Sequence, residues 1–251
     1  MIYIEKPQEV GAETNELVGQ EWGVQRIGAN KVWADGNIGQ GVIVANIDTG
    51  VRASHEALKR NFIGKNGWYD PELQSDEPYD IHGHEVGCSE EDLLTCAQFV
   101  LCPTDTKGQN EDCSKAPQVV SNSWGGDGGD SFYKGAVDAW TKAGIVTVFS
   151  QGNDGRKGCS TAGSPGQLIR SIWNTTDTAY STISGTSMAA PHVTGAVALL
   201  LSAQPDLAID EVKVALYTTT DQKGLKASNY TCGGTSDADW PNNQWGHGRL
   251  N

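Results

Sequence analysis

Positive charge and long apolar runs are both scarce in this sequence. There are 18 lysine and arginine residues against 31 aspartate and glutamate residues, which gives a net charge of −13. Such a chain repels phosphate backbones and offers no basic stripe, so nucleic acid is excluded as a partner. The longest purely apolar run, AVALLL at 196–201, is far shorter than the roughly 20 residues of a membrane-spanning helix, so no membrane association is expected.

Paired CxxC spacings are also missing, which argues against a structural zinc site. Disulfides formed in an oxidising compartment explain the cysteines better, and the sequence leaves their pairing open. Two glycosylation sequons, Asn174-Thr175-Thr176 and Asn229-Tyr230-Thr231, agree with a secreted protein. The six cysteines are Cys88, Cys96, Cys102, Cys113, Cys159 and Cys232.

Residues 1–20 contain neither a basic start nor an apolar stretch, so they show no secretory signal. We therefore expect a chain that is processed, truncated or misassigned at its start, with residues 1–20 as a residual pro-segment or linker. The full-length product is expected to carry a signal and a pro-segment upstream of about residue 20. The chain has 251 residues, 37% of them hydrophobic, which suits one large domain over residues 21–251, and we expect a monomer.

Short β-branched segments at 41–50, 118–126 and 144–153 have the profile of buried parallel strands. Helical periodicity lies between them, at 89–101 with Ser89 as its N-cap and at 130–144 with a stop at Gly144. Alternating strands and helices predict an α/β fold of three layers, a mostly parallel sheet with helices on both faces and functional residues at the carboxyl ends of its strands. The predicted buried stripe of the first helix contains Leu93, Leu94, Ala97, Val100 and Leu101, and the second helix places Phe132, Ala136, Trp140 and Ala143 on one face.

The segment GTSMAAPHVTGAVALL, residues 185–200, is the strongest functional signal. Ser187 lies at the predicted start of a helix, where the helix dipole and unpaired N–H groups favour the negative charge that develops during acyl transfer. Pro191 fits the first turn, in which its missing N–H costs nothing. A buried helix with a serine N-cap would produce the same pattern, so other residues must decide.

Several motifs together resemble those of the subtilisin-like serine proteases. GTSMAAPHVTG is similar to the nucleophile motif of that family, and VANIDTGV (44–51) is similar to its aspartate motif. SNSWGG (121–126) resembles the substrate-binding strand, SQGNDG (150–155) resembles the oxyanion segment, and residues 23–58 are similar to the start of the mature domain. The order Asp, His, Ser is that of subtilisin.

This resemblance implies a secreted serine endopeptidase that acts on protein or peptide substrates. Ser187 would be the nucleophile and His84 the general base, while Asp48 would orient the base and stabilise its protonated form. Asn153 would donate a hydrogen bond to the oxyanion. An extended substrate would pair with the edge formed by Ser123, Trp124 and Gly125. A pro-segment or an inhibitor is a further partner that the resemblance implies.

Each motif also has a simpler interpretation. Asp48-Thr49-Gly50 alone could belong to an aspartic protease, but that mechanism needs two carboxylates that share a proton, and no second DTG occurs. Asn153 could be a turn residue with unusual dihedral angles, although its place after a buried strand favours a function. His192 is predicted to be a packed helix histidine. Calcium is common in the family, but no carboxylate-rich loop resembles a site for it, so no cofactor is predicted.

The stretch YDIHGHEVGCSEED at 79–92 contains the base. Asp80, Gly83 and His84 resemble the family's D-x-x-G-H, which favours His84 over His82. In the family this histidine opens a buried helix, and a further strand and helix follow it. Here only residues 85–88 separate His84 from the next predicted helix, whereas a βαβ unit takes about 30 residues.

We therefore predict an internal deletion near 84/85. It should leave His84 on a loop, with at least one of its contacts to Ser187 and Asp48 too long for general-base catalysis. Asp48, Asn153 and Ser187 should still converge at the carboxyl edge of the sheet.

A second deletion is predicted near residue 166, because the chain passes from the oxyanion segment to the nucleophile without the strand and hairpin usual in the family. The final WGHGRLN (245–251) resembles the last family motif with its following helix cut off. The sheet is thus expected to lack one or two strands, which would weaken the domain. Two functions remain open: an active secreted endopeptidase, or a catalytically impaired fragment or isoform that at most binds peptides.

Overall fold

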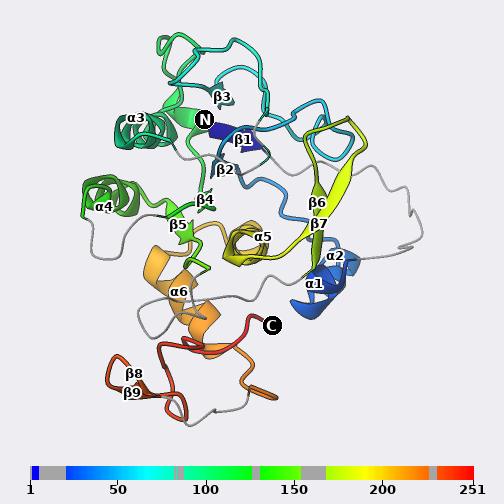
Figure 1. Cartoon of the computed structure of the whole chain (residues 1–251), viewed down its shortest axis with the longest axis vertical. Coiled ribbons are helices and arrows are strands. Elements are labelled where there is room, and N and C mark those ends of the chain that lie inside the picture. Colours follow the sequence, from blue (N-terminus) through cyan, green and yellow to red (C-terminus); the bar gives the residue numbers. More distant parts are fainter. Residues whose placement is uncertain are drawn as a thin grey trace.

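The computed structural model describes residues 2–5, 21–81, 83, 88–125, 131–153, 168–225 and 231–251, which contain both helices and strands (Figure 1). The helices are α1 Trp22–Arg26, α2 Ala29–Ala34, α3 Glu90–Leu101, α4 Lys134–Lys142, α5 Thr186–Ala203 and α6 Ile209–Thr218. The strands are β1 Ile2–Glu5, β2 Val44–Ile47, β3 Trp68–Tyr69, β4 Val119–Asn122, β5 Val146–Phe149, β6 Ile169–Ile172, β7 Tyr180–Ile183, β8 Thr231–Cys232 and β9 Thr235–Ser236.

The main sheet contains five strands in the order β3-β1-β2-β4-β5. β2, β4 and β5 run parallel, with Val44 opposite Val119 and Val119 opposite Val146. β1 runs antiparallel to both of its neighbours, β2 and β3. The predicted α/β fold is confirmed, and the three predicted strands correspond to β2, β4 and β5. The antiparallel β1 is an addition that the sequence did not predict. The hairpin β6–β7 lies between Asn153 and Ser187, where the sequence was expected to lack a hairpin, so that expectation is wrong.

Helices cover both faces of this sheet, as predicted (Figure 1). On one face, α3 and α4 enclose a core that includes Ile47, Val120 and the fully buried Trp140. On the other face, α5 and α6 pack over a core that includes Val119 and Val197. Val119 and Val120 enter different cores because successive residues of a strand point to opposite faces of a sheet.

α5 is the most apolar helix of the described ranges and by length and composition alone could cross a membrane. In the fold it lies against β4 and β5, and Val197, Ala198 and Leu201 are buried there. Its apolar composition is therefore explained by its packing on the sheet, where one side of the helix contributes to the core.

The start of α3 is fixed by Ser89, whose hydroxyl accepts a hydrogen bond from the backbone N–H of Asp92 at 3.1 Å. A cap of this kind is worth about 1 kcal/mol, and the three acidic residues of the first turn favour the helix dipole. The predicted buried stripe is wrong at Leu94, which is exposed. The buried face follows the spacing i, i+3, i+4, i+7 and includes a cysteine, which leaves Leu94 on the solvent side. Its members are Leu93, Cys96, Ala97 and Val100, with Phe99 beside them.

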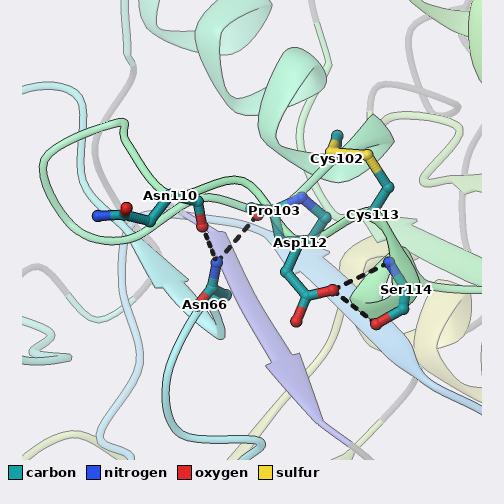
Figure 2. Close-up of a disulfide and its surroundings, with 7 residues drawn as sticks. All are labelled: Asn66, Cys102, Pro103, Asn110, Asp112, Cys113 and Ser114. Carbon is teal, nitrogen blue, oxygen red and sulfur yellow. Dashed lines mark hydrogen bonds between the residues drawn. A yellow bond between two sulfur atoms is a disulfide. The ribbon is translucent and has the colours of Figure 1, made fainter.

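A disulfide joins Cys102, immediately after α3, to Cys113. Asn66 crosses the loop that this bond closes, and its Nδ2 donates to the carbonyl oxygens of Pro103 at 3.1 Å and Asn110 at 3.0 Å (Figure 2). Asn66 is buried, so these bonds satisfy both hydrogens of its side-chain amide. The loop is thus attached to the chain that enters β3.

The predicted use of cysteine in disulfides is confirmed for this pair. Cys96 is a buried thiol under α3, and burial raises its pKa to about 11. Cys88 is an exposed thiol just before α3, and Cys159 lies outside the described residues.

Candidate active site

The parallel strands end at one edge of the sheet, where three of the predicted site residues follow them. Asp48 follows β2, Ser123 follows β4 and Asn153 comes after β5. Ser187, the second residue of α5, joins Asp48 and Ser123 in the lining of one cavity of about 610 Å³. The chain therefore brings the proposed nucleophile and the proposed aspartate to the same opening, at the place where α/β folds bind ligands.

Ser187 and Ser123 are held together by two reciprocal hydrogen bonds. The Ser187 hydroxyl donates to the carbonyl oxygen of Ser123 at 2.9 Å, and the Ser123 hydroxyl donates to the carbonyl oxygen of Ser187 at 3.1 Å. Pro191 accounts for the second bond: since it has no N–H, it cannot donate to the carbonyl four residues earlier in α5. The prediction that Pro191 lies in the first turn is wrong, because α5 begins at Thr186 and places it in the second.

Asn153 is oriented by Thr186. Its Oδ1 accepts hydrogen bonds from the backbone N–H of Thr186 at 2.8 Å and from the Thr186 hydroxyl at 3.0 Å. A backbone N–H can only donate, so the amide oxygen must face Thr186 and the Nδ2 hydrogens are turned away from it. A Cβ at Gly185 would lie 3.5 Å from the Asn153 amide, which shows how closely the two segments approach. Asn153 thus presents a donor beside the amino end of α5.

The turn after β2 depends on a glycine. Asp48 Oδ1 accepts the backbone N–H of Thr49 at 2.8 Å, and Gly50 follows with a φ of +154°. A Cβ at Gly50 would lie 2.4 Å from the carbonyl oxygen of Tyr79, which also accepts the Val51 N–H at 3.0 Å. Glycine is therefore what allows the segment around Tyr79 to lie against the Asp48 turn.

The segment that leads to the proposed base is fixed as far as Gly83. The Gly83 N–H donates to Asp80 Oδ1 at 2.9 Å, and the glycine adopts a φ of +62°. Both residues line the cavity that contains Ser187. In the D-x-x-G-H pattern the aspartate thus closes a turn and the glycine supplies its left-handed conformation. His82 and His84 lie outside the described residues, so the predicted position of His84 stays a prediction.

The tip of the β6–β7 hairpin is bonded to the two segments just described, an arrangement that we call the hairpin latch. Arg52 Nε and the Ser54 hydroxyl donate to Asp177 Oδ1 at 2.6 and 2.7 Å. Arg52 also donates through Nη1 to the carbonyl oxygen of Asn174 at 2.9 Å, and Asn174 Nδ2 donates to the carbonyl oxygen of Asp80 at 3.3 Å. The hydrogen bonds from Ser54 and Arg52 hold the pKa of Asp177 below its ordinary value.

Sequence reasoning missed the latch because each of its bonds joins residues more than ninety positions apart. The one available signal was the sequon at Asn174, and it pointed to glycosylation. The structure instead gives this side chain a contact with the segment that precedes His84.

His55 is a fully buried histidine that sequence reasoning also passed over. Its Nδ1 accepts the backbone N–H of Ala57 at 3.2 Å, so Nε2 carries the proton and donates to the carbonyl oxygen of Ala179 at 2.9 Å. The ring also lies edge-on to Tyr180, with centroids 5.0 Å apart. Both ring nitrogens are occupied, so His55 secures the hairpin and is not a candidate base.

Trp124 and Gly125, the other predicted substrate contacts, have contrasting surroundings. The Trp124 ring lies edge-on to Tyr133 at 4.9 Å and to Phe149 at 5.5 Å, which anchors the end of β4 from the core side. Gly125 is exposed, and the position of a Cβ there is open. The segment after β4 is thus held on one side and open on the other.

Comparisons with known proteins identify the class. The subtilase family, Peptidase S8, matches residues 102–175 and 173–234, which together exceed half of the chain. This chain belongs to the subtilase family, and the predicted resemblance is confirmed.

Individual relatives extend the match to most of the chain. It is 31% identical to Bacillopeptidase F of Bacillus subtilis (strain 168) over 330 residues, which cover 93% of this chain and 22% of the relative. It is 30% identical to the extracellular serine proteinase of Thermus sp. (strain Rt41A) over 288 residues, covering 91% of this chain and 68% of that protein. Subtilisin DY of Bacillus licheniformis is 27% identical over 254 residues, covering 81% and 92%. The chain therefore spans about a fifth of the first relative but most of the third.

Within the described ranges, no group of three or more His, Cys, Asp or Glu side chains is arranged to hold a metal ion. The expectation about calcium stays a prediction. The chemistry proposed below uses only side chains and backbone groups of the chain itself.

Proposed function

We propose that this chain is a serine endopeptidase and that the cavity at the carboxyl edge of the sheet is its active site. The observation that carries the proposal is that Asp48, Ser123 and Ser187 line one cavity at the amino end of α5, in a chain of the subtilase family. The relatives named as serine proteinases give the reaction class, and protein or peptide chains are the substrates that we propose.

In this mechanism the Ser187 Oγ attacks the carbonyl carbon of the scissile peptide bond. His84 takes the hydroxyl proton and later gives it to the leaving amine, after which water hydrolyses the acyl-enzyme by the reverse sequence. Asp48 stabilises the imidazolium. The negative charge on the substrate oxygen is met by the Asn153 amide donor and by the amino end of α5.

The Ser187 hydroxyl must leave one partner to enter this reaction. It has a single proton, which it now donates to the carbonyl oxygen of Ser123. Catalysis therefore requires the hydroxyl to rotate toward the base, and exchanging one hydrogen bond for another costs little if the base is in place.

The substrate would lie along residues 123–125. Its extended backbone would pair with the exposed side of this segment, as in strand addition, while Trp124 holds the other side to the core. Gly125 leaves room for the approaching chain because it has no side chain there.

We further propose that the internal deletion predicted near 84/85 is a real feature of this chain. The alignment with Bacillopeptidase F runs over 330 residues although the chain has only 251, so the relative carries residues with no counterpart here. The cavity beside Ser187 is in addition lined by aliphatic side chains and reaches Gly83, directly before the predicted junction at 84/85. Such a lining fits a place from which an apolar segment is missing. This deletion is the reason for keeping the alternative function, a catalytically impaired form that at most binds peptides.

The test is covalent labelling with a fluorophosphonate, which reacts with an activated serine. The active form should incorporate one label, at Ser187, and Ser187→Ala should abolish it. Ser202→Ala is the matched control, since Ser202 lies on α5 and bonds to the carbonyl oxygen of Gln40, away from the cavity. His84→Ala should slow labelling strongly.

The outcomes separate the alternatives. A folded chain that takes no label but still binds peptides is the impaired form. Labelling that persists in Ser187→Ala contradicts the choice of nucleophile, and labelling unchanged in His84→Ala contradicts the choice of base.

A secretory history is also proposed. The disulfide Cys102–Cys113 and the name of the extracellular Thermus relative support it. Recovery of the native protein from a reducing cytosol, with both of these sulfurs as thiols, would contradict it. The monomeric state and an upstream pro-segment remain proposals from the same resemblance.

A further inference from the structure

The N-terminal strand β1 is the structural feature that neither the family resemblance nor the proposed chemistry explains. Ile2–Glu5 runs antiparallel between β2 and β3, whereas β2, β4 and β5 run parallel. It is therefore an inner strand of the sheet and not a segment lying on its surface. Antiparallel strands inside an otherwise parallel sheet are unusual, since mixed sheets commonly carry them at an edge.

β1 supplies hydrogen-bonding partners that two other strands would otherwise lack. The register places Ile2 opposite Ile47 and Tyr69, and Tyr3 opposite Asn46 and Trp68. Among the described strands, β3 pairs with β1 alone, and β2 has only β4 on its other side. Without β1, the main sheet would lose β3 and would expose one edge of β2. An exposed strand edge offers a row of unpaired N–H and C=O groups that readily accepts another strand.

The edge of β2 that would be exposed is the one at which the next strand of a parallel βαβ unit normally pairs. Strands that follow each other through a helical crossover usually lie side by side, and β4 already occupies one side of β2. A further strand inserted after β2 in a longer relative would thus need the side that β1 now holds. The alignment with Bacillopeptidase F is longer than this chain, so that relative carries residues with no counterpart here.

We propose that the edge of β2 is a strand-accepting surface and that Ile2–Glu5 of the same chain is its occupant, a complementing strand that completes the sheet. The position has a functional consequence, since Ile2 pairs with Ile47, the residue directly before Asp48. β1 therefore stabilises the end of the strand that carries the proposed catalytic aspartate. It follows that residues 2–5 act as part of the folded domain and not as a dispensable pro-segment.

Hydrogen exchange on the full chain tests this proposal without relying on any activity. Amides of 2–5 and 44–47 should exchange slowly, as those of β4 do, because they are paired inside a sheet. Ile4→Pro should speed exchange at 44–47 by about tenfold or more while leaving β5 slow, and Ile4→Val should change neither. A peptide with the sequence of residues 1–8, added in trans to Ile4→Pro, should restore slow exchange at 44–47. Fast exchange at 2–5 in the unmodified chain would overturn the proposal.

A cross-link gives a second test should Ile4→Pro not fold. Directly opposite residues of an antiparallel pair have Cβ atoms about 4.5–5.5 Å apart, whereas diagonal neighbours lie about 7–8 Å apart, too far for a disulfide. Tyr3→Cys with Asn46→Cys should therefore form a disulfide in the oxidised chain. Glu5→Cys with Asn46→Cys, shifted by two positions along β1, is the matched control and should not. Equal cross-linking of the two pairs, or none in the first, would refute the pairing.

Because these readouts are structural, the proposal stands apart from the proposed function. A chain that takes no fluorophosphonate but shows protected amides at 2–5 would keep the complementing strand and lose the enzyme. The reverse result would keep the enzyme and lose the complementing strand.

Discussion

Gly50→Ala is the substitution for which the structure allows the most specific expectation. Gly50 separates the Asp48 turn from the segment that leads to the proposed base. An alanine Cβ would lie 2.4 Å from the carbonyl oxygen of Tyr79 and 2.9 Å from the Asp80 Cα, both of which belong to the backbone. Ordinary contact begins at about 3.4 Å, so one of the two segments has to move by about 1 Å.

Two costs follow from this movement. The alanine would hold a backbone conformation that only glycine adopts readily, at about 1–3 kcal/mol, and the Val51 to Tyr79 hydrogen bond would weaken, at about 0.5–1.5 kcal/mol. We therefore expect the free energy of unfolding to fall by about 2–4 kcal/mol. The effect on reaction rate should be larger, since a displacement of 1 Å near reacting groups can cost about a hundredfold.

Urea unfolding gives the stability change, and the rate of fluorophosphonate labelling at Ser187 gives the functional change under native conditions. Gly64→Ala is the matched control, because Gly64 also has a positive φ, +77°, but nothing lies within 4 Å of its Cβ position. It should lose about 1–2 kcal/mol of stability and none of its labelling rate. The reasoning is refuted if folded Gly50→Ala is labelled at the unmodified rate, or if Gly64→Ala slows labelling equally.

Three further substitutions test the latch and the disulfide. Asp177→Asn should slow labelling by releasing Arg52, and it should lower stability more at pH 7 than at pH 3. The sign follows from the lowered pKa of Asp177: its stabilising effect is fully present above the ordinary value of 3.8 and is lost as the pH falls through the lowered folded-state pKa, so urea titrations that give equal losses at both pH values would contradict this account. Asn174→Gln should slow labelling because the donor to Asp80 is displaced, and mass spectrometry of the secreted protein should find Asn174 without a glycan; full glycosylation of an active chain there would argue against the contact. Cys102→Ser should lower the free energy of unfolding by about 2–3 kcal/mol, and an unchanged urea midpoint would show that the loop is held by other contacts alone.

The fold was predictable where the determinants are local. The β-branched runs that became β2, β4 and β5 are short and apolar, Ser89 caps α3, and Gly144 follows α4 with a φ of +80°. Helix boundaries were less predictable. Pro191 was expected in the first turn of α5, where a missing N–H costs nothing. The structure places it in the second turn, and the carbonyl oxygen of Ser187 accepts the hydroxyl of Ser123 in place of the missing N–H.

The candidate site was predictable through its motifs, but the contacts that assemble it were not. The motifs contain Asp48, Asn153 and Ser187, yet nothing in them shows that Thr186 orients the asparagine or that Asp177 binds Arg52. Such contacts depend on which segments meet in three dimensions. The same limit applies to β1. Four residues can form a strand in many contexts, and Ile2–Glu5 form one here because they pair with the free side of β2.

The reciprocal pair of Ser187 and Ser123 has a consequence for how the proposed nucleophile would respond to acylating reagents before any substrate arrives. A hydroxyl that donates to a carbonyl is less nucleophilic than one that donates to a base. The hydrogen bond to Ser123 should therefore slow acylation of Ser187 while no substrate is bound. The same pair ties the end of β4 to the start of α5, which makes the two segments move as one. A peptide that pulls residues 123–125 into a strand would therefore also disturb the hydroxyl's resting bond, and substrate docking would itself release the nucleophile.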